Sequence, residues 1–228
     1  MDGPEFDDLW VVVPVYNEAP VLERTLADLT ARFPHVCVVD DASTDPSRLI
    51  AEAFFGQGVR LVRHPVNLGQ GAALQTGFEY VLGDPLMARV VTFDADGQHL
   101  VSDAVQLARR LSEGFDVVLG SRLLGRAPNM GRFKRLVLKA AVAYTNFSTG
   151  LKLTDTHNGL RAMSRAAVAA MNLTQPGMAH ATEVIERIKQ EKLAFTEAGV
   201  EIHYSDYSRS KGQSLLNSVN ILVDLLVK

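Results

Sequence analysis

Two aspartates, Asp94 and Asp96, stand on either side of one small residue, directly after the apolar stretch RVVTF at 89–93. This stretch is rich in β-branched residues, which is typical of a parallel strand covered on both faces. Its carboxyl end is where open α/β sheets bind ligands. Carboxylates so close repel each other unless a proton or a cation lies between them, and oxygen ligands suit Mg²⁺ or Mn²⁺. The pair predicts a metal site, and the alternative is a turn in which an aspartate caps the next helix.

Polar or glycine-rich groups also follow the three other strands expected in the first half of the chain. Because the carboxyl ends of parallel strands meet at one edge of a sheet, we expect these groups to surround the aspartate pair. They are Asn17 and Glu18 after a strand at 9–13, Asp40 and Asp41 after a strand at 36–39, and Gly69 to Gly71 after a strand at 59–63.

Short apolar strands alternate with helical spacing along this half, which predicts an α/β fold with a mostly parallel sheet and helices on both faces. Pro20 is expected to open the first helix, where its missing N–H costs nothing. The remaining expected elements are a short helix after 45, helices at 67–81, 102–113 and 131–149, a strand at 116–119, a polar loop at 154–161, a helix with Glu183 near its start, a strand around 200–204, a basic loop at 207–214 and an apolar helix at 215–227.

The composition limits the class of protein. With 228 residues, 47% hydrophobic and 21% charged, the chain suits one substantial domain at 1–214 followed by the terminal helix at 215–228. A net charge of −3 argues against general nucleic-acid binding. The single cysteine, Cys37, lies in an apolar strand and is expected in the core. The acidic N-terminus lacks the features of a signal peptide, and no segment reaches the ~20 apolar residues of a membrane span, so we expect a cytoplasmic location.

The span 117–154 contains no acidic residue, although the chain as a whole is acidic. A charge run is often only a solvated face, but a stretch this long without an acid favours contact with an anionic partner. Its basic residues are Arg122, Arg126, Arg132, Lys134, Arg135, Lys139 and Lys152.

Together these stretches resemble the family 2 glycosyltransferases of GT-A fold, and within them the dolichol- or polyprenyl-phosphate sugar synthases. The resemblance covers nearly the whole chain and implies a GT-A-like fold that transfers a sugar, with inversion, from a nucleotide-sugar such as a UDP- or GDP-sugar. It implies Mg²⁺ or Mn²⁺ as the cofactor. The motifs that carry it are VVVPVYNE at 11–18, VVDDASTD at 38–45, RHPVNLGQGAALQTG at 63–77, FDADGQH at 93–99, GSR at 120–122, DTHNGLRAMSR at 155–165 and YSRSKGQS at 207–214.

The resemblance assigns the metal and the donor nucleotide to particular residues. Asp94, Asp96 and Gln98 match the metal-binding trio of the family. The alternative role of Tyr16 is packing. Asp41 matches the second nucleotide contact of the family, whereas Asp40 is expected to cap or brace the loop instead. The GQGA stretch at 69–72 only partly matches a dinucleotide-binding fingerprint. The residues matched to donor contacts are Pro14, Tyr16, Glu18, Asp41, Asn67, Gly69, Gly71 and Asp94, with Arg209 and Lys211 in a loop that closes over the site.

Three further residues match catalytic positions near the acceptor. Arg122 and Arg135 match basic positions that meet the acceptor phosphate or the donor diphosphate, because a guanidinium donates to two oxygens at once. Glu183 matches a carboxylate near the sugar, where it is a general base for a hydroxyl acceptor or a partner of sugar hydroxyls. Its alternative is an ordinary first-turn helix residue. Among the six histidines, His99 and His157 are the two expected to reach the site.

The favoured prediction is an enzyme of cell-envelope polysaccharide assembly that transfers a sugar to a polyprenyl phosphate. Many lipid-linked relatives continue into transmembrane helices, whereas this sequence stops at Lys228. The terminal helix is therefore expected to lie on the inner face of the cytoplasmic membrane, to pair with a second copy in a homodimer, or to pack on its own domain.

Three other functions remain open. The first is transfer to a hydroxyl of a soluble or glycan acceptor, with Glu183 as the base. The second is a sugar-nucleotide nucleotidyltransferase, which would want a glycine-rich, arginine-containing loop where this chain has Pro14 to Glu18. The third is a nucleotide-binding regulatory subunit, against which the intact trio at 94–98 argues.

Overall fold

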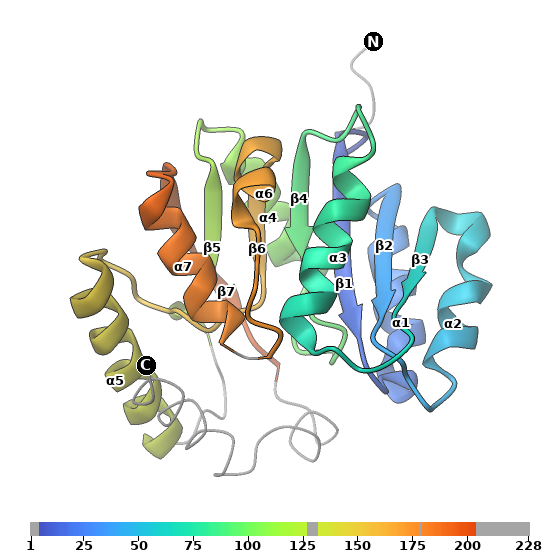
Figure 1. Ribbon diagram of the computed structural model, residues 1–228, viewed down its shortest axis with the longest axis horizontal. Helices are drawn as coiled ribbons and strands as arrows, with labels where there is room; N and C mark the ends of the chain where they lie inside the picture. Colours follow the sequence, from blue (N-terminus) through green and yellow to red (C-terminus); the bar gives the residue numbers. More distant parts are fainter. Residues whose placement is uncertain (1–4, 127–131, 178, 204–228) are drawn as a thin grey trace.

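One mixed sheet of seven strands lies at the centre of the computed structural model, which describes residues 5–126, 132–177 and 179–203 (Figure 1). The order across the sheet is β3-β2-β1-β4-β6-β5-β7. The strands are β1 (Leu9–Val15), β2 (His35–Asp40), β3 (Val59–Arg63), β4 (Arg89–Thr92), β5 (Val117–Arg126), β6 (Arg161–Ser164) and β7 (Phe195–Glu201).

Most neighbouring strands are parallel. β1 runs parallel to β2 and β4, β2 to β3, and β5 to β7, whereas β6 runs antiparallel between β4 and β5. The predicted mostly parallel sheet is confirmed. The arrowheads of β1 and β2 point to the same lower edge in Figure 1, so the loops that follow these strands meet there.

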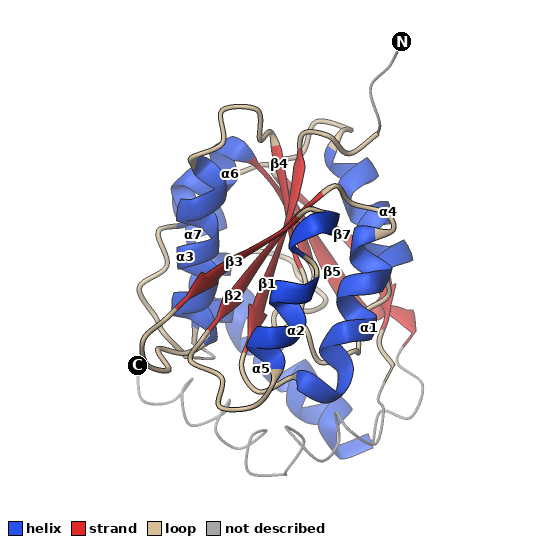
Figure 2. Ribbon diagram, turned by 90° about the vertical axis from the view of Figure 1, so that its right-hand side faces the viewer, coloured by secondary structure: helices blue, strands red, loops and turns tan. Residues whose placement is uncertain are grey.

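Helices cover both faces of the sheet, as the alternating pattern predicted (Figure 2). α1, α2 and α4 pack on one face, and α3, α6 and α7 pack on the other, while α5 lies beside α7. A short 3₁₀ helix at Phe55–Gln57 precedes β3. The α-helices are α1 (Ala19–Thr30), α2 (Ser47–Ala53), α3 (Gln70–Leu82), α4 (Val101–Leu111), α5 (Arg132–Thr149), α6 (Arg165–Met171) and α7 (His180–Gln190).

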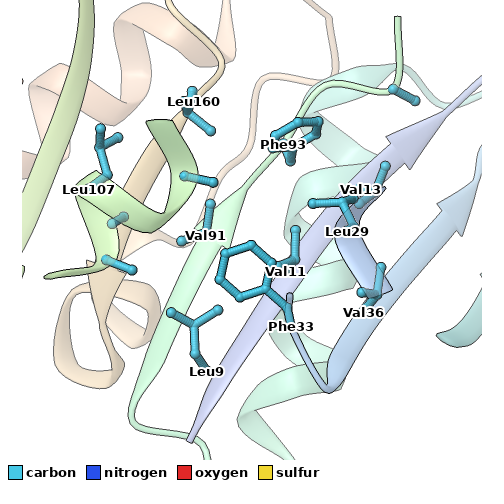
Figure 3. Packing of buried hydrophobic residues seen from close by; sticks show 14 of the residues in the cluster. Leu9, Val11, Val13, Leu29, Phe33, Val36, Val91, Phe93, Leu107 and Leu160 are labelled. Atoms are coloured by element: carbon cyan, nitrogen blue, oxygen red, sulfur yellow. The ribbon is translucent and has the colours of Figure 1, made fainter. Parts of the chain in front are cut away.

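The core follows from the alternation of side chains along the central strands. On β1, Val11 and Val13 pack on the face of α1 and α4, whereas Val12 packs on the face of α3. Figure 3 shows Val11 beside Val91 of β4, with Leu107 of α4 nearby. Truncating a fully buried leucine such as Leu107 to alanine costs roughly 2–5 kcal/mol, so this layer holds the β4 terminus firmly in place.

Three predictions for the second half of the chain were wrong. The strand predicted at 116–119 continues to Arg126 as β5, two elements were missed, and β7 begins earlier than predicted. β6 and α6 lie at 161–171, where the sequence predicted the end of a loop followed only by the helix of Glu183. β6 has only four residues and begins with the buried Arg161, so it lacks the apolar run that marks the other strands. β7 begins at Phe195 rather than near Val200, because its alternating small and polar residues conceal the strand.

The predictions for the cysteine, the terminal helix and membrane-spanning segments have different outcomes. Cys37 is buried in β2, and its burial raises the pKa of the thiol to about 12, which confirms a core residue. The helix predicted at 215–227 lies outside the described residues, so its separation from the domain stays a prediction. Within the described part of the chain, no helix combines the length and apolar character needed to cross a bilayer.

Candidate active site

The aspartate pair lies just beyond β4, at the edge of the sheet where β1 and β2 also end. Asp94 is held from two sides. The amide nitrogen of Gln70, at the start of α3, donates to Asp94 Oδ1 at 2.8 Å, and Nε2 of His99 lies 3.1 Å from Oδ2. Gly159 lies against the same carboxylate so closely that a Cβ at this position would be 2.0 Å from Oδ2. Two segments far apart in sequence, at Gln70 and Gly159, therefore fix this carboxylate together with His99 of its own loop.

The environment of Asp94 favours its ionised form. Burial alone would raise its pKa, but the hydrogen bond and charge of His99, with the charges of Arg161 and His180, outweigh burial and lower the pKa. Arg161 is 2% exposed, so its positive charge is buried beneath the site. Asp94 is thus a permanent carboxylate near neutral pH.

Asp96 differs from its neighbour. Its burial and the charge of Asp94, with a smaller contribution from Glu18, raise the pKa of Asp96 to about 6. Its two oxygens accept hydrogen bonds from Gln98, one from the backbone N–H at 3.0 Å and one from the side-chain amide. A cation placed between the two carboxylates would remove the repulsion that raises this pKa.

The donor set fits a hard divalent cation. Two carboxylates and the side-chain amide of Gln98 offer oxygen ligands on one turn, which suits Mg²⁺ or Mn²⁺. Within the described residues, no three side chains of His, Cys, Asp or Glu gather closely enough to hold a metal by themselves. A cation here would therefore complete its coordination with amide, water or phosphate oxygens, as Mg²⁺ commonly does.

The loop after β1 is tied to the loop after β2. The backbone N–H of Asn17 donates to Ser43 Oγ at 2.9 Å, and the side-chain oxygen of Asn17 accepts from the N–H of Thr44 at 2.7 Å. Tyr16, on this loop, is 43% exposed, so part of its ring is accessible at the surface. Pro14 and Glu18 are half-buried nearby. Nucleotide contact by Pro14, Tyr16 and Glu18 stays a prediction.

Asp41, which the resemblance matched to a nucleotide contact, already forms hydrogen bonds within the protein. It is 3% exposed and accepts the backbone N–H groups of Leu68 at 2.8 Å and Gly69 at 2.7 Å. It also lies 2.7 Å from Nδ1 of His64. Asp40 braces its own loop, as its alternative role anticipated, by accepting the N–H of Ser43 at 3.0 Å. Both carboxylates therefore brace their loops, and contact of Asp41 with the nucleotide stays a prediction.

The glycines after β3 have a structural reason besides the predicted donor contact, and that contact stays a prediction. A Cβ at Gly69 would lie 2.4 Å from the carbonyl oxygen of Pro176, and one at Gly71 would lie 2.0 Å from that of Gln175. Gly69 also has a φ of +95°, which L side chains rarely adopt. The absence of side chains at these glycines therefore lets the 175–177 backbone pack against the start of α3. Asn67 is exposed, and its predicted donor contact stays a prediction.

Arg122 forms a bidentate ion pair with the buried Asp155. Its Nε and Nη2 lie 2.7 and 2.8 Å from the two carboxylate oxygens. Burial would raise the pKa of Asp155, but the charge and hydrogen bonds of Arg122 outweigh it and lower the pKa. Contact of Arg122 with a phosphate stays a prediction, and any such contact would build on a guanidinium that Asp155 already orients.

Glu183 is the predicted site residue whose role the structure changes most. Its carboxylate accepts the N–H of Thr174 at 3.0 and 2.9 Å, the hydroxyl of Thr174 at 2.7 Å and the N–H of Gln175 at 2.9 Å. Burial would raise its pKa, but these hydrogen bonds, with the charge of Arg187, lower it. A carboxylate that already accepts these hydrogen bonds and has a lowered pKa is a weak proton acceptor, so this geometry favours a structural role over that of a general base.

The remaining predicted positions cannot be described at the level of side chains. Arg135 belongs to the first part of α5, whose side chains lie outside the described residues. Arg209 and Lys211 also lie outside the described residues. Of the two histidines expected to reach the site, His99 contacts Asp94, whereas Nδ1 of His157 bonds Thr156 Oγ1 at 2.8 Å.

Sequence analysis missed residues that the fold brings to the aspartate pair. Gln70 and Gly159 contact Asp94 directly, and Arg161 and His180 are buried beneath it. Gly159 and Arg161 lie in the motif DTHNGLRAMSR, and Gln70 lies in RHPVNLGQGAALQTG, so the motifs contained the signal. What the sequence lacked was the tertiary pairing of these motifs with β4.

Comparison with known proteins places this arrangement among known enzymes. The sequence model described as Glycosyl transferase family 2 matches residues 10–171. An uncharacterized protein of Methanocaldococcus jannaschii is 33% identical over 97% of this chain and 92% of its own. A UDP-N-acetylglucosamine–dolichyl-phosphate N-acetylglucosaminyltransferase of Methanococcus voltae is 26% identical over 96% of this chain and 95% of its own. An undecaprenyl-phosphate 4-deoxy-4-formamido-L-arabinose transferase of Shewanella sediminis is 31% identical over 96% of this chain and 66% of its own.

Solved structures agree on the fold. Glucosyl-3-phosphoglycerate synthase from Mycobacterium tuberculosis, in complex with Mn²⁺, UDP and phosphoglyceric acid, superposes with a TM-score of 0.67 at 20% identity. The match covers 96% of this chain and 77% of that one. The same synthase has also been crystallised with Mg²⁺ and UDP. At this identity the likeness establishes the GT-A fold, which confirms the fold predicted from sequence.

Proposed function

Because the chain belongs to Glycosyl transferase family 2, we propose that it transfers a sugar from a nucleotide-sugar to a polyprenyl phosphate, with a divalent cation at Asp94, Asp96 and Gln98. That it is a glycosyltransferase follows from the family. The finer assignments of metal, donor and acceptor are the proposal. Two of the relatives are named for transfer to dolichyl or undecaprenyl phosphate, and this supports the choice of acceptor.

The single observation that carries the choice of acceptor is the state of Glu183. Its carboxylate is engaged by Thr174 and Gln175, and its pKa is lowered. A hydroxyl acceptor needs a base to remove its proton, and such a base contributes roughly 10²–10⁴-fold. A phosphate monoester is already an anion near pH 7 and attacks without one. The engaged carboxylate therefore favours a phosphate acceptor.

The reaction then balances without proton transfer to the enzyme. An oxygen of the acceptor phosphate forms a bond to the anomeric carbon on the face opposite the leaving group. The bond from that carbon to the donor phosphate breaks, and the nucleoside diphosphate leaves with the electron pair. A cation bound at the aspartate pair would supply charge stabilisation to the departing diphosphate. Asp94 and Asp96 would hold it, and Arg122, oriented by Asp155, would lie among the cationic groups that position phosphate.

A paired-acceptor assay tests the proposal. The purified protein, a panel of UDP- and GDP-sugars and Mn²⁺ are combined with a short polyprenyl phosphate, the same polyprenol without its phosphate, or 3-phosphoglycerate. We expect sugar transfer to the polyprenyl phosphate, no transfer to the polyprenol, and loss of transfer in EDTA. Transfer to the alcohol or to the phosphoglycerate hydroxyl alone would overturn the lipid-phosphate assignment and leave the glycosyltransferase assignment standing.

A further inference from the structure

Gln70 connects the aspartate pair to a part of the molecule that carries no predicted metal ligand. It is the first residue of α3, and its side-chain amide donates to Asp94 Oδ1 at 2.8 Å. Since His99 occupies Oδ2, the two contacts together fix the rotation of the Asp94 carboxylate. A residue that fixes a metal ligand in this way tunes metal affinity without touching the metal.

The backbone of Gln70 is itself fixed on both sides. The N–H of Gly69 donates to Asp41 Oδ2 at 2.7 Å, and the N–H of Gly71 donates to the carbonyl oxygen of Pro176 at 2.7 Å. The second bond is possible because Gly71 has no Cβ to collide with the 175–177 backbone. The position of Gln70 therefore depends on where the segment before α7 lies.

That segment is held by Glu183. The carboxylate of Glu183 reaches back from the first turn of α7 and accepts hydrogen bonds from Thr174 and Gln175, directly before Pro176. The side-chain oxygen of Gln75, on α3, holds the same segment by accepting the N–H of Leu173 at 2.7 Å. A continuous series of contacts thus leads from Glu183 through Pro176 and Gly71 to Gln70.

We infer that Gln70 is a positioning residue for Asp94, and that Glu183 acts on the metal site through the 174–176 segment and Gln70 instead of removing a proton. This inference rests on the metal assignment of the proposed function. It gives Glu183 a role that requires a carboxylate in the ionised state, because four donor contacts converge on it. The two roles make opposite predictions about metal binding in the absence of an acceptor.

The first test replaces the amide of Gln70. Gln70→Leu keeps a similar volume and removes the donor to Asp94. Mn²⁺ binding is measured by electron paramagnetic resonance titration in the presence of UDP, without sugar donor or acceptor. We expect the dissociation constant for Mn²⁺ to rise roughly 10- to 100-fold, the usual effect of losing a partner of a metal ligand. Gln106→Leu, on the exposed face of α4, is the matched control and should bind Mn²⁺ like the wild type.

The second test replaces the carboxylate at the far end of the series. Glu183→Gln keeps one acceptor oxygen but turns an amide N–H toward the N–H donors of the loop. We expect it to weaken Mn²⁺ binding roughly tenfold and to leave the shape of the pH profile of kcat unchanged. Glu191→Gln, exposed at the end of α7, is the control. Thr174→Val removes only the 2.7 Å hydroxyl contact and should weaken Mn²⁺ binding less, which provides a milder variant if Glu183→Gln does not fold.

The outcomes separate this inference from the proposed function. If the wild type binds Mn²⁺ and the Gln70 and Glu183 variants bind it equally well, the positioning role is wrong while the metal assignment stands. If the Glu183 variant binds Mn²⁺ normally but loses the fall of kcat at low pH, Glu183 is a base. If the wild type itself does not bind Mn²⁺ with UDP, the metal assignment fails and this inference fails with it.

Discussion

Two acidic pairs lie at the ends of the two strands that flank β1, and their surroundings in the folded protein differ. Asp40 is the last residue of β2 and Asp41 follows it, whereas Asp94 and Asp96 lie just beyond β4. Asp41 is saturated by two backbone N–H groups and His64. Asp96 instead accepts from its own turn, and its pKa is raised to about 6 by burial and by Asp94.

The difference between the two pairs shows that a place at this edge of the sheet does not by itself determine what a carboxylate does. Both pairs lie at the ligand-binding edge of a parallel sheet, and both look alike as short acidic motifs. The first pair is neutralised by donors that the fold supplies, so its charge stabilises the loops. The second pair retains an unrelieved repulsion, which a cation would remove. The predictions below test this contrast, from the largest expected effect to the smallest.

The largest effect is expected at Asp96. Asp96→Asn removes a proposed metal ligand, and transfer should fall by about 10³-fold or more, equivalent to roughly 4 kcal/mol of transition-state stabilisation. Stability should be unchanged or higher, because burial and Asp94 disfavour the charge that is lost. The measurements are kcat at saturating Mn²⁺ and the urea midpoint. A variant that transfers normally, or that unfolds like a loop mutant, would contradict the contrast.

The next effect is expected at Gly159, where space decides the outcome. Gly159→Ala places a Cβ where Asp94 Oδ2 lies, only 2.0 Å away, so the carboxylate must move. A displacement of about 1 Å can cost roughly 10²-fold in rate, and we expect a loss of that order in kcat. Gly56→Ala is the control, since a Cβ there meets nothing within 4 Å. Equal activity of the two variants would show that Asp94 tolerates displacement.

The sequence was sufficient for the first half of the fold, because its signals are local. Val11 to Val13 and Val90 to Val91 are apolar runs that end in polar turns, and such runs predict strands and the edge where they meet. The short β6 offered no run of this kind, since Arg161 and Ser164 bound it. A buried arginine in a strand reflects tertiary charges, namely Asp94 and Asp155, which no local pattern reveals.

The sequence motifs pointed to residues of the candidate site, but they did not indicate what each side chain contacts. The motifs contained Asp41 and Glu183, but a sequence does not say which donors will converge on a carboxylate. That convergence depends on loops from distant segments, such as 67–71 for Asp41 and 174–175 for Glu183. Asp94 and Asp96 were recognised together because two carboxylates so close repel each other unless the fold or a cation supplies positive charge or donors.

Asp41 should behave in the opposite way to Asp96. Asp41→Asn keeps the shape of the side chain but replaces one carboxylate oxygen with an NH₂ group. This group faces the backbone N–H of Gly69 or Leu68, so one buried donor loses its acceptor. The expected loss is about 3 kcal/mol of unfolding free energy, read from urea denaturation. Mn²⁺ binding per folded molecule should weaken without being lost, because Asp41 holds only one of the two backbone N–H groups that flank Gln70. A stable Asp41→Asn protein with lost nucleotide affinity would instead make Asp41 a direct ligand of the donor.

The smallest predicted effect is a pH dependence of stability carried by His180, beneath the Asp94 pair. Burial, with the charge of Arg161, lowers the pKa of His180 to about 4, against an ordinary value of 6.5. Between these two values the unfolded chain binds a proton that the folded protein does not, so this group contributes stability above pH 6.5 that is lost as the pH falls toward 4. Between pH 7.5 and pH 5 the loss should be about 2 kcal/mol.

Asp96 acts in the opposite direction over part of this range, because its pKa is raised and its folded form takes up a proton below about pH 6. The two contributions partly cancel in the wild type, so the absolute pH profile does not isolate the histidine. His180→Gln retains a donor for the carbonyl of Gly177 but cannot titrate. The difference in unfolding free energy between wild type and His180→Gln should therefore shrink by about 2 kcal/mol from pH 7.5 to pH 5. A constant difference would mean that the buried surroundings of His180 admit the imidazolium, and that the charges around the second acidic pair are less desolvated than its geometry indicates.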